Sequence, residues 1–290
     1  MVYAFVLKIF LAFFGGIALV SNSALLVYTL LLKERHMFEK LVLIHVTGSA
    51  ITGLGYLTSY TIKLSTSCHL HYSTPANCIA RSPQIFCFVI GIPMESMGVL
   101  ILVFDRFIAT LNRSSWKFTN YHLVICMSTI ASIVTCMAIA LLLLCLYTKG
   151  TIISSCCYME TTAPKYYYEL YYYLILSTGY ANITVFTVTA IRYWHKRLHQ
   201  LDSEHLQQSS GKYEAVCMKH TAIICLFGFM LQTIPSTIST YAYHNDTDSV
   251  IVPNMSAICI ACYCAYPVYR FWTNPFCNRD NNSSVTFLNT

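Results

Sequence analysis

The stretch LVICMSTIASIVTCMAIALLLLCLY, residues 123–147, runs for 25 residues without a charged side chain. About 20 apolar residues span the hydrocarbon core of a bilayer, so this stretch predicts a transmembrane helix. The whole chain has the same character: 56% of its residues are hydrophobic, 10% are charged, and its mean hydropathy is +0.54. A soluble domain carries about 25% charged residues. This chain lacks the polar side chains that a water-soluble globule of its size needs.

Six further segments are long and apolar enough to cross a membrane. They cover residues 9–32, 41–62, 83–104, 170–191, 221–243 and 250–269. The first is longer than the 7–15-residue core of a cleaved signal peptide, so we expect it to be retained as a helix. The sequence therefore predicts an all-α membrane protein. We expect residues 1–290 to form one seven-helix transmembrane domain, in which residues 270–290 are a short cytoplasmic tail.

The loops between these segments differ in basic charge. Of the 18 Lys and Arg residues, 13 lie in the alternate loops that include the tail, and 5 lie on the opposite side. Because cytoplasmic loops carry the excess of Lys and Arg, we expect the N-terminus outside and the tail in the cytoplasm. No basic stripe or long basic tail is present, which argues against nucleic acid as a partner.

The predicted third helix ends in the triplet Asp105-Arg106-Phe107, on the cytoplasmic side. A neighbouring carboxylate can hold an arginine as an ion pair in a partly dry setting. Such a pair can act as a latch, because movement of a helix would free the arginine for a new partner.

This triplet, at this place in a seven-helix chain, resembles the Asp/Glu-Arg-Tyr signature of rhodopsin-like G-protein-coupled receptors. The intact run Asp-Arg-x-Ile-Ala-Thr at 105–110, the short N-terminus and the many Cys and Tyr residues are most similar to nematode serpentine chemoreceptors. The resemblance implies a receptor at the plasma membrane, sensory cilia included, with a role in olfaction. It also implies a small extracellular ligand and a heterotrimeric G protein as partners, and no cofactor.

Four cysteines lie on the predicted outer side. Cys68 and Cys78 precede the third helix or lie at its top, and Cys156 and Cys157 lie between the fourth and fifth helices. Disulfides persist on this oxidising side. The resemblance implies a bridge from the top of the third helix to the loop after the fourth. The choice between Cys156 and Cys157 is open, and two bridges are possible.

Prolines interrupt the predicted sixth and seventh helices at Pro235 and Pro267. A proline inside a helix removes one hydrogen bond and kinks the helix, so Pro235 is either a hinge or a fixed kink. The family's Asn-Pro-x-x-Tyr pattern is only partly present, because Tyr266 replaces the Asn and Tyr269 is one residue too close. Together with Asp105 and Arg106, we count Pro235, Pro267 and Tyr269 as switch candidates.

Two polar residues lie well inside predicted spans. Asn22 in the first helix resembles the family's helix-one Asn. Glu95 is the one acid well inside a span, and an ionisable residue there is functional by default. Glu95 can act as an internal structural or switching group or contact a ligand directly. Tyr172 and Tyr173, in a tyrosine-rich run, belong either to an interfacial aromatic belt or to a ligand pocket.

Other functional classes fit less well. A transporter or channel remains the alternative. Such a protein would be expected to line a path through the membrane with several polar residues, and the predicted spans contain only Glu95 and a few amides. An enzyme would need clustered His or acidic residues within the spans. Neither HExxH nor a pair of CxxC motifs is present, and Cys259 and Cys262 form a single CxxC inside an apolar segment. A retinal protein would need a Lys in the last helix, where none occurs.

Overall fold

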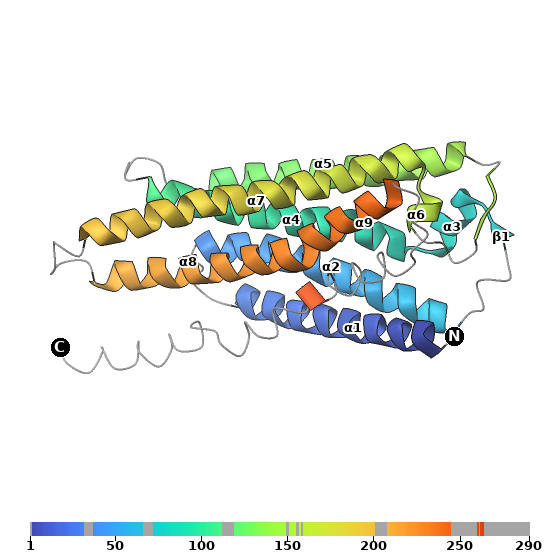
Figure 1. Cartoon of the computed structure of the whole chain (residues 1–290), viewed down its shortest axis with the longest axis horizontal. Coiled ribbons are helices and arrows are strands. Elements are labelled where there is room, and N and C mark those ends of the chain that lie inside the picture. Colours follow the sequence, from blue (N-terminus) through green and yellow to red (C-terminus); the bar gives the residue numbers. More distant parts are fainter. Residues whose placement is uncertain are drawn as a thin grey trace.

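The computed structural model describes residues 2–31, 37–65, 72–111, 119–148, 151–154, 157, 159–200, 208–244, 260, 262 and 263. Within these residues the chain is a bundle of long helices that run alternately up and down, with their axes nearly parallel (Figure 1). Six of the described helical stretches are long and apolar enough to cross a membrane. The predicted all-α membrane fold is therefore confirmed in this coarser form.

The long helices correspond to six of the predicted spans. They are α1 (Val2–Leu31), α2 (Met37–Ser65), α4 (Gln84–Thr110), α5 (Asn120–Tyr147), α7 (Lys165–Gln200), and the consecutive α8 (Gln208–Gly228), η2 (Phe229–Thr233) and α9 (Ile234–His244). Each extends beyond the apolar segment that predicted it at one or both ends. Hydropathy marks the part of a helix that can lie in hydrocarbon, whereas backbone hydrogen bonding continues into the polar flanks.

Short elements cluster at one end of the bundle. They are strand β1 (Tyr72–Ser73), helix α3 (Pro75–Arg81), strand β2 (Ile153–Ser154) and helix α6 (Met159–Thr162). The strands pair antiparallel, Tyr72 with Ser154 and Ser73 with Ile153. Helix α3 begins where the Thr74 side chain accepts a hydrogen bond from the Asn77 N–H, 3.3 Å away, and where Pro75 fits the first turn.

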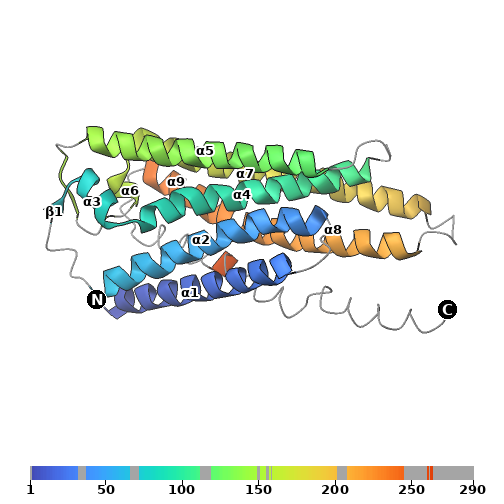
Figure 2. The same cartoon turned by 180° about the vertical axis from the view of Figure 1, so that it is seen from behind.

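Helix α4 is the centre of the bundle. It contacts α2, α5, α7 and α8, and it lies between α2 and α5 in the view of Figure 2. Glycines allow α2 to approach it closely: a Cβ atom on Gly48 would lie 2.5 Å from the Glu95 nitrogen, and one on Gly91 would lie 2.7 Å from the Thr52 nitrogen. Small residues at helix contacts are the usual means of close packing in membranes.

Three residues of the predicted seventh span, 250–269, belong to the described part of the chain. Ile260 packs with Leu7, Leu11, Ala18 and Tyr56 of α1 and α2. The Tyr263 ring lies 5.8 Å from the His45 ring of α2. Ile260 and Tyr263 therefore lie against α1 and α2. The rest of the segment, Pro267 and Tyr269 included, lies outside the described residues.

Candidate functional site

The Asp105–Arg106 pair lies in the last two turns of α4. Arg106 Nε donates to Asp105 Oδ2 at 2.9 Å, and the Nη2 atom of the same guanidinium donates to the same oxygen. The Arg106 side chain is 11% exposed and that of Asp105 is 8% exposed. An ion pair this dry holds more firmly than a surface pair, because water screens it less. The structure therefore brings together the two residues that the sequence predicted as a latch.

An aromatic side chain from another helix also contacts Arg106. The Arg106 guanidinium lies over the ring of Phe38, 5.3 Å from the ring centroid. Phe38 is 2% exposed and lies in the first turn of α2. A cation above a ring face is attracted by the negative face of the π system. The arginine is thus held by a carboxylate of its own helix and by a ring of α2.

Near the middle of α4, Glu95 is completely buried. Its Oε1 atom accepts a hydrogen bond from Ser49 Oγ of α2. The Nδ1 atom of His45, also on α2, lies 3.5 Å from the Glu95 carbonyl oxygen. Glu95 therefore joins α4 to α2 through its side chain. The internal role and the ligand contact expected for it both stay predictions.

The next residue of α4, Ser96, joins it to two other helices. Asn182 Nδ2 of α7 donates to the Ser96 carbonyl oxygen at 3.2 Å, and Gln232 Nε2 of η2 donates to Ser96 Oγ at 3.2 Å. All three side chains are buried. Asn182 Oδ1 has no hydrogen-bond partner among the described residues. We call His45, Ser49, Glu95, Ser96, Asn182 and Gln232 the polar junction.

The sixth long helix changes geometry where it meets the polar junction. Residues Phe229–Thr233 form a π-helical turn, and the Ile234 N–H closes it by bonding to the Phe229 carbonyl oxygen. Pro235 is the next residue and has no N–H to donate. The regular pattern of α-helical hydrogen bonds is therefore interrupted twice in succession, by the π turn and by the proline. The predicted irregularity at Pro235 is thus joined by a π turn that carries Gln232 toward α4.

At the end of the bundle that holds α3 and α6, one disulfide joins Cys78 of α3 to Cys157, with 5.3 Å between the Cα atoms. The predicted bridge is confirmed, and Cys157 is the partner. Cys68 and Cys156 lie outside the described residues. The β1–β2 pair joins the same two parts of the chain. The bridge and the strands together hold the segment before α6 against α3.

The tyrosine run at the start of α7 is divided between core and surface. Tyr167 and Tyr171 are buried and donate hydrogen bonds of 2.9 Å to the carbonyl oxygens of Met137 on α5 and Phe88 on α4. Tyr172 is half-buried, and its ring lies 4.6 Å from that of Tyr168, whereas Tyr173 is 52% exposed. The ligand role predicted for Tyr172 and Tyr173 stays a prediction.

Asn22 is completely buried in α1. Its Nδ2 atom donates to the Ala18 carbonyl oxygen at 2.7 Å, one turn earlier in the same helix. The role predicted for Asn22 from the family resemblance stays a prediction.

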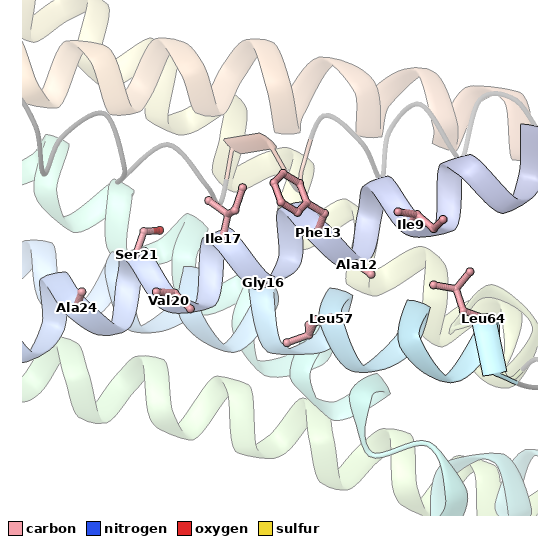
Figure 3. A pocket seen from close by; sticks show the side chains of 10 residues that line it. All are labelled: Ile9, Ala12, Phe13, Gly16, Ile17, Val20, Ser21, Ala24, Leu57 and Leu64. Carbon is pink, nitrogen blue, oxygen red and sulfur yellow. The ribbon is translucent and has the colours of Figure 1, made fainter.

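Among the described residues, two of the apolar grooves follow the flanks of the bundle. The larger, about 770 Å³, runs along α1 beside α2, and Figure 3 shows Phe13, Ile17 and Leu57 among its lining side chains. The smaller, about 460 Å³, is lined by α2, α4 and α5 and includes Met94, the residue before Glu95. Surfaces of this chemistry suit hydrocarbon chains, in keeping with the membrane lipid expected around such helices.

Comparison of the chain with protein-family models and with curated proteins finds no match to either. The geometry of the described residues therefore carries the functional argument.

Sequence reasoning missed the partners of the residues that it found. Phe38 and Ser49 are ordinary residues for a membrane helix and gave no signal. Asn182 and Gln232 are amides within apolar segments, and that polarity was the available clue to them. Only the fold shows that the two amides meet at Ser96.

Proposed function

We propose that this chain is a chemosensory G-protein-coupled receptor of the plasma membrane, with a role in olfaction. In this proposal a small extracellular ligand binds toward the disulfide end of the bundle and shifts a two-state helix arrangement. The Arg106 end then engages a heterotrimeric G protein. A ligand shifts such an equilibrium only by binding one state more tightly than the other.

The observation that carries the proposal is the buried Asp105–Arg106 pair at the end of the central helix. A guanidinium that is 11% exposed has lost most of its water and depends on its partners. Movement of the neighbouring helices can expose it to a protein that offers new acceptors. The disulfide at the opposite end supports the proposal, because it fixes the chain beside the proposed ligand entrance.

Seven spans with the N-terminus outside are part of the proposal. The excess of basic residues in alternate loops supports the orientation, and the packing of Ile260 and Tyr263 against α1 and α2 supports a seventh span. The expected short cytoplasmic tail, 270–290, follows from the same count.

The first test is activation of G proteins in cells that express the chain. A panel of G-protein subtypes is combined with a panel of small apolar odorants, and the best response is compared with that of Arg106→Ala. Hydrogen bonds to a charged group contribute about 1.5–3 kcal/mol, so we expect the Arg106 variant to lose about tenfold or more of the response.

Arg81→Ala is the control for loss of an exposed arginine. Because α3 lies at the end where the ligand is proposed to bind, the responses are compared at saturating ligand. The Arg81 variant should respond as the unmodified chain does. An unchanged response from Arg106→Ala at equal surface expression would contradict the receptor proposal.

The polar junction favours a second candidate, a transporter or channel, because it brings six polar residues together inside the bundle. However, three hydrogen bonds already join these residues across helices. Polar groups that bond to one another hold helices together, whereas a transport path needs polar groups that face a solute or an ion. Ion currents or solute uptake that persist in cells without G proteins, and that disappear in Glu95→Gln, would favour the transporter or channel.

A further inference from the structure

Asp105 and Phe38 hold Arg106 in different ways. Asp105 is the neighbour of Arg106 on the same helix, so their ion pair moves with α4 and keeps its length when α4 shifts as a unit. Phe38 belongs to α2, so its distance from the guanidinium changes whenever the ends of α2 and α4 separate or slide. Of these two contacts, the ring contact is the one that can register helix movement.

Phe38 is itself held firmly. It is 2% exposed and belongs to the core cluster that also contains Leu41, Leu102 and Val103. Helix α8 enters the same cluster through Cys217 and Met218. A change in the position of α8 can therefore reach Phe38 through packed side chains.

We propose that Phe38 is a positioning residue that keeps the receptor silent without ligand, because its ring holds the Arg106 guanidinium against Asp105. This inference rests on the proposed receptor function and adds that the contact between the Arg106 guanidinium and the Phe38 ring breaks on activation. In the active arrangement α2 and α4 move apart at this end, the guanidinium leaves the ring, and it becomes available to the G protein. The ring contact sets the basal level of signalling.

The test is basal G-protein activation at equal surface expression, without ligand. Phe38→Leu removes the ring and keeps an apolar side chain in the core, and Phe38→Met does the same with a more adaptable side chain should the leucine variant fold poorly. Phe38→Tyr retains the ring. A desolvated cation–π contact is worth a factor of about 5 to 30 in an equilibrium. We expect the Leu and Met variants to raise basal signalling by up to that factor, and the Tyr variant to stay near the unmodified level.

Phe186→Leu is the matched control. Phe186 lies on α7 in the same core cluster, 8% exposed, and no arginine or lysine of the described chain lies over its ring. If Phe186→Leu raises basal signalling as much as Phe38→Leu does, the effect is general loosening of the core and the inference is overturned.

Asp105→Asn separates this inference from the receptor proposal, since it weakens the ion pair directly. A rise in basal signalling with Asp105→Asn and none with the Phe38 variants overturns the role of Phe38 and leaves the receptor proposal standing. No change with any of these variants, together with an unaffected Arg106→Ala, overturns both.

Discussion

At the residue scale, the carboxyl group of Glu95 shows how a costly group is retained inside the bundle. An unpaired polar group in hydrocarbon costs several kcal/mol. Glu95 avoids this cost by accepting a hydrogen bond from Ser49, which Gly48 makes possible by letting α2 approach α4 closely. Ser49 and Gly48 thus act together: the glycine allows the close approach, and the serine donates the hydrogen bond.

We predict that Ser49→Ala lowers the free energy of unfolding by about 1 to 2 kcal/mol, because it leaves Glu95 Oε1 without this donor. Glu95→Gln keeps an acceptor at the same place and should cost less. The measurement is the thermal midpoint of the detergent-solubilised protein. Thr47→Val is the control, since the Thr47 hydroxyl donates to the Leu43 carbonyl oxygen of its own helix at 2.7 Å. Equal losses in Ser49→Ala and Thr47→Val would contradict the interhelical role.

Some residues of the candidate site could be predicted from the sequence, and others could not. Arg106 and Glu95 could be predicted because a charge beside or within an apolar stretch is expensive and stands out. Ser49 and Phe38 could not, because hydroxyl and aromatic residues are common in membrane helices. Their roles depend on which face of α2 meets α4, and a hydropathy pattern says nothing about that.

At the element scale, the bridge between Cys78 and Cys157 joins positions 79 residues apart in the sequence. Such a link restricts the unfolded chain and is worth about 2 to 4 kcal/mol. The family resemblance implied a bridge in this region, and the position of the cysteines in outer loops agreed with it. The sequence could not choose between adjacent cysteines, since the choice depends on which side chain faces α3. Strands β1 and β2 could not be predicted from the sequence either, because two residues are too few to show an alternating pattern.

We predict that Cys78→Ser and Cys157→Ser each lower the free energy of unfolding by about 2 to 4 kcal/mol, and that the double variant costs little more than either one alone. Unfolding of the purified proteins measures the stability of the single and double variants. Peptide mapping under non-reducing conditions shows whether the disulfide is present. Cys136→Ser is the control, because Cys136 is free and exposed. Additive losses in the double variant would show that the two cysteines act separately.

At the scale of the whole molecule, the number of spans fixes where the two ends of the chain lie. An even number of spans places both termini on one side of the membrane, and an odd number places them on opposite sides. Apolar length predicts seven spans, and six of the described helical stretches are long and apolar enough to cross a membrane. The seventh rests on residues 250–269 and on the packing of Ile260 and Tyr263 against α1 and α2.

A pair of glycosylation reporters decides between six and seven spans. One is placed ahead of Met1 and the other after Thr290, and each is scored by an enzyme-sensitive shift in gel mobility. We expect the first to be modified and the second to stay unmodified, because 13 of the 18 basic residues lie in the loops that this arrangement places in the cytoplasm. A third reporter within 201–207, between α7 and α8, should stay unmodified in the same way. Modification of both terminal reporters would leave Arg106 at the cytoplasmic end but place the tail outside, and the proposed receptor would then lack its seventh helix. Modification of only the reporters after Thr290 and within 201–207 would invert the bundle, place Arg106 outside the cell and remove the basis for coupling to a G protein.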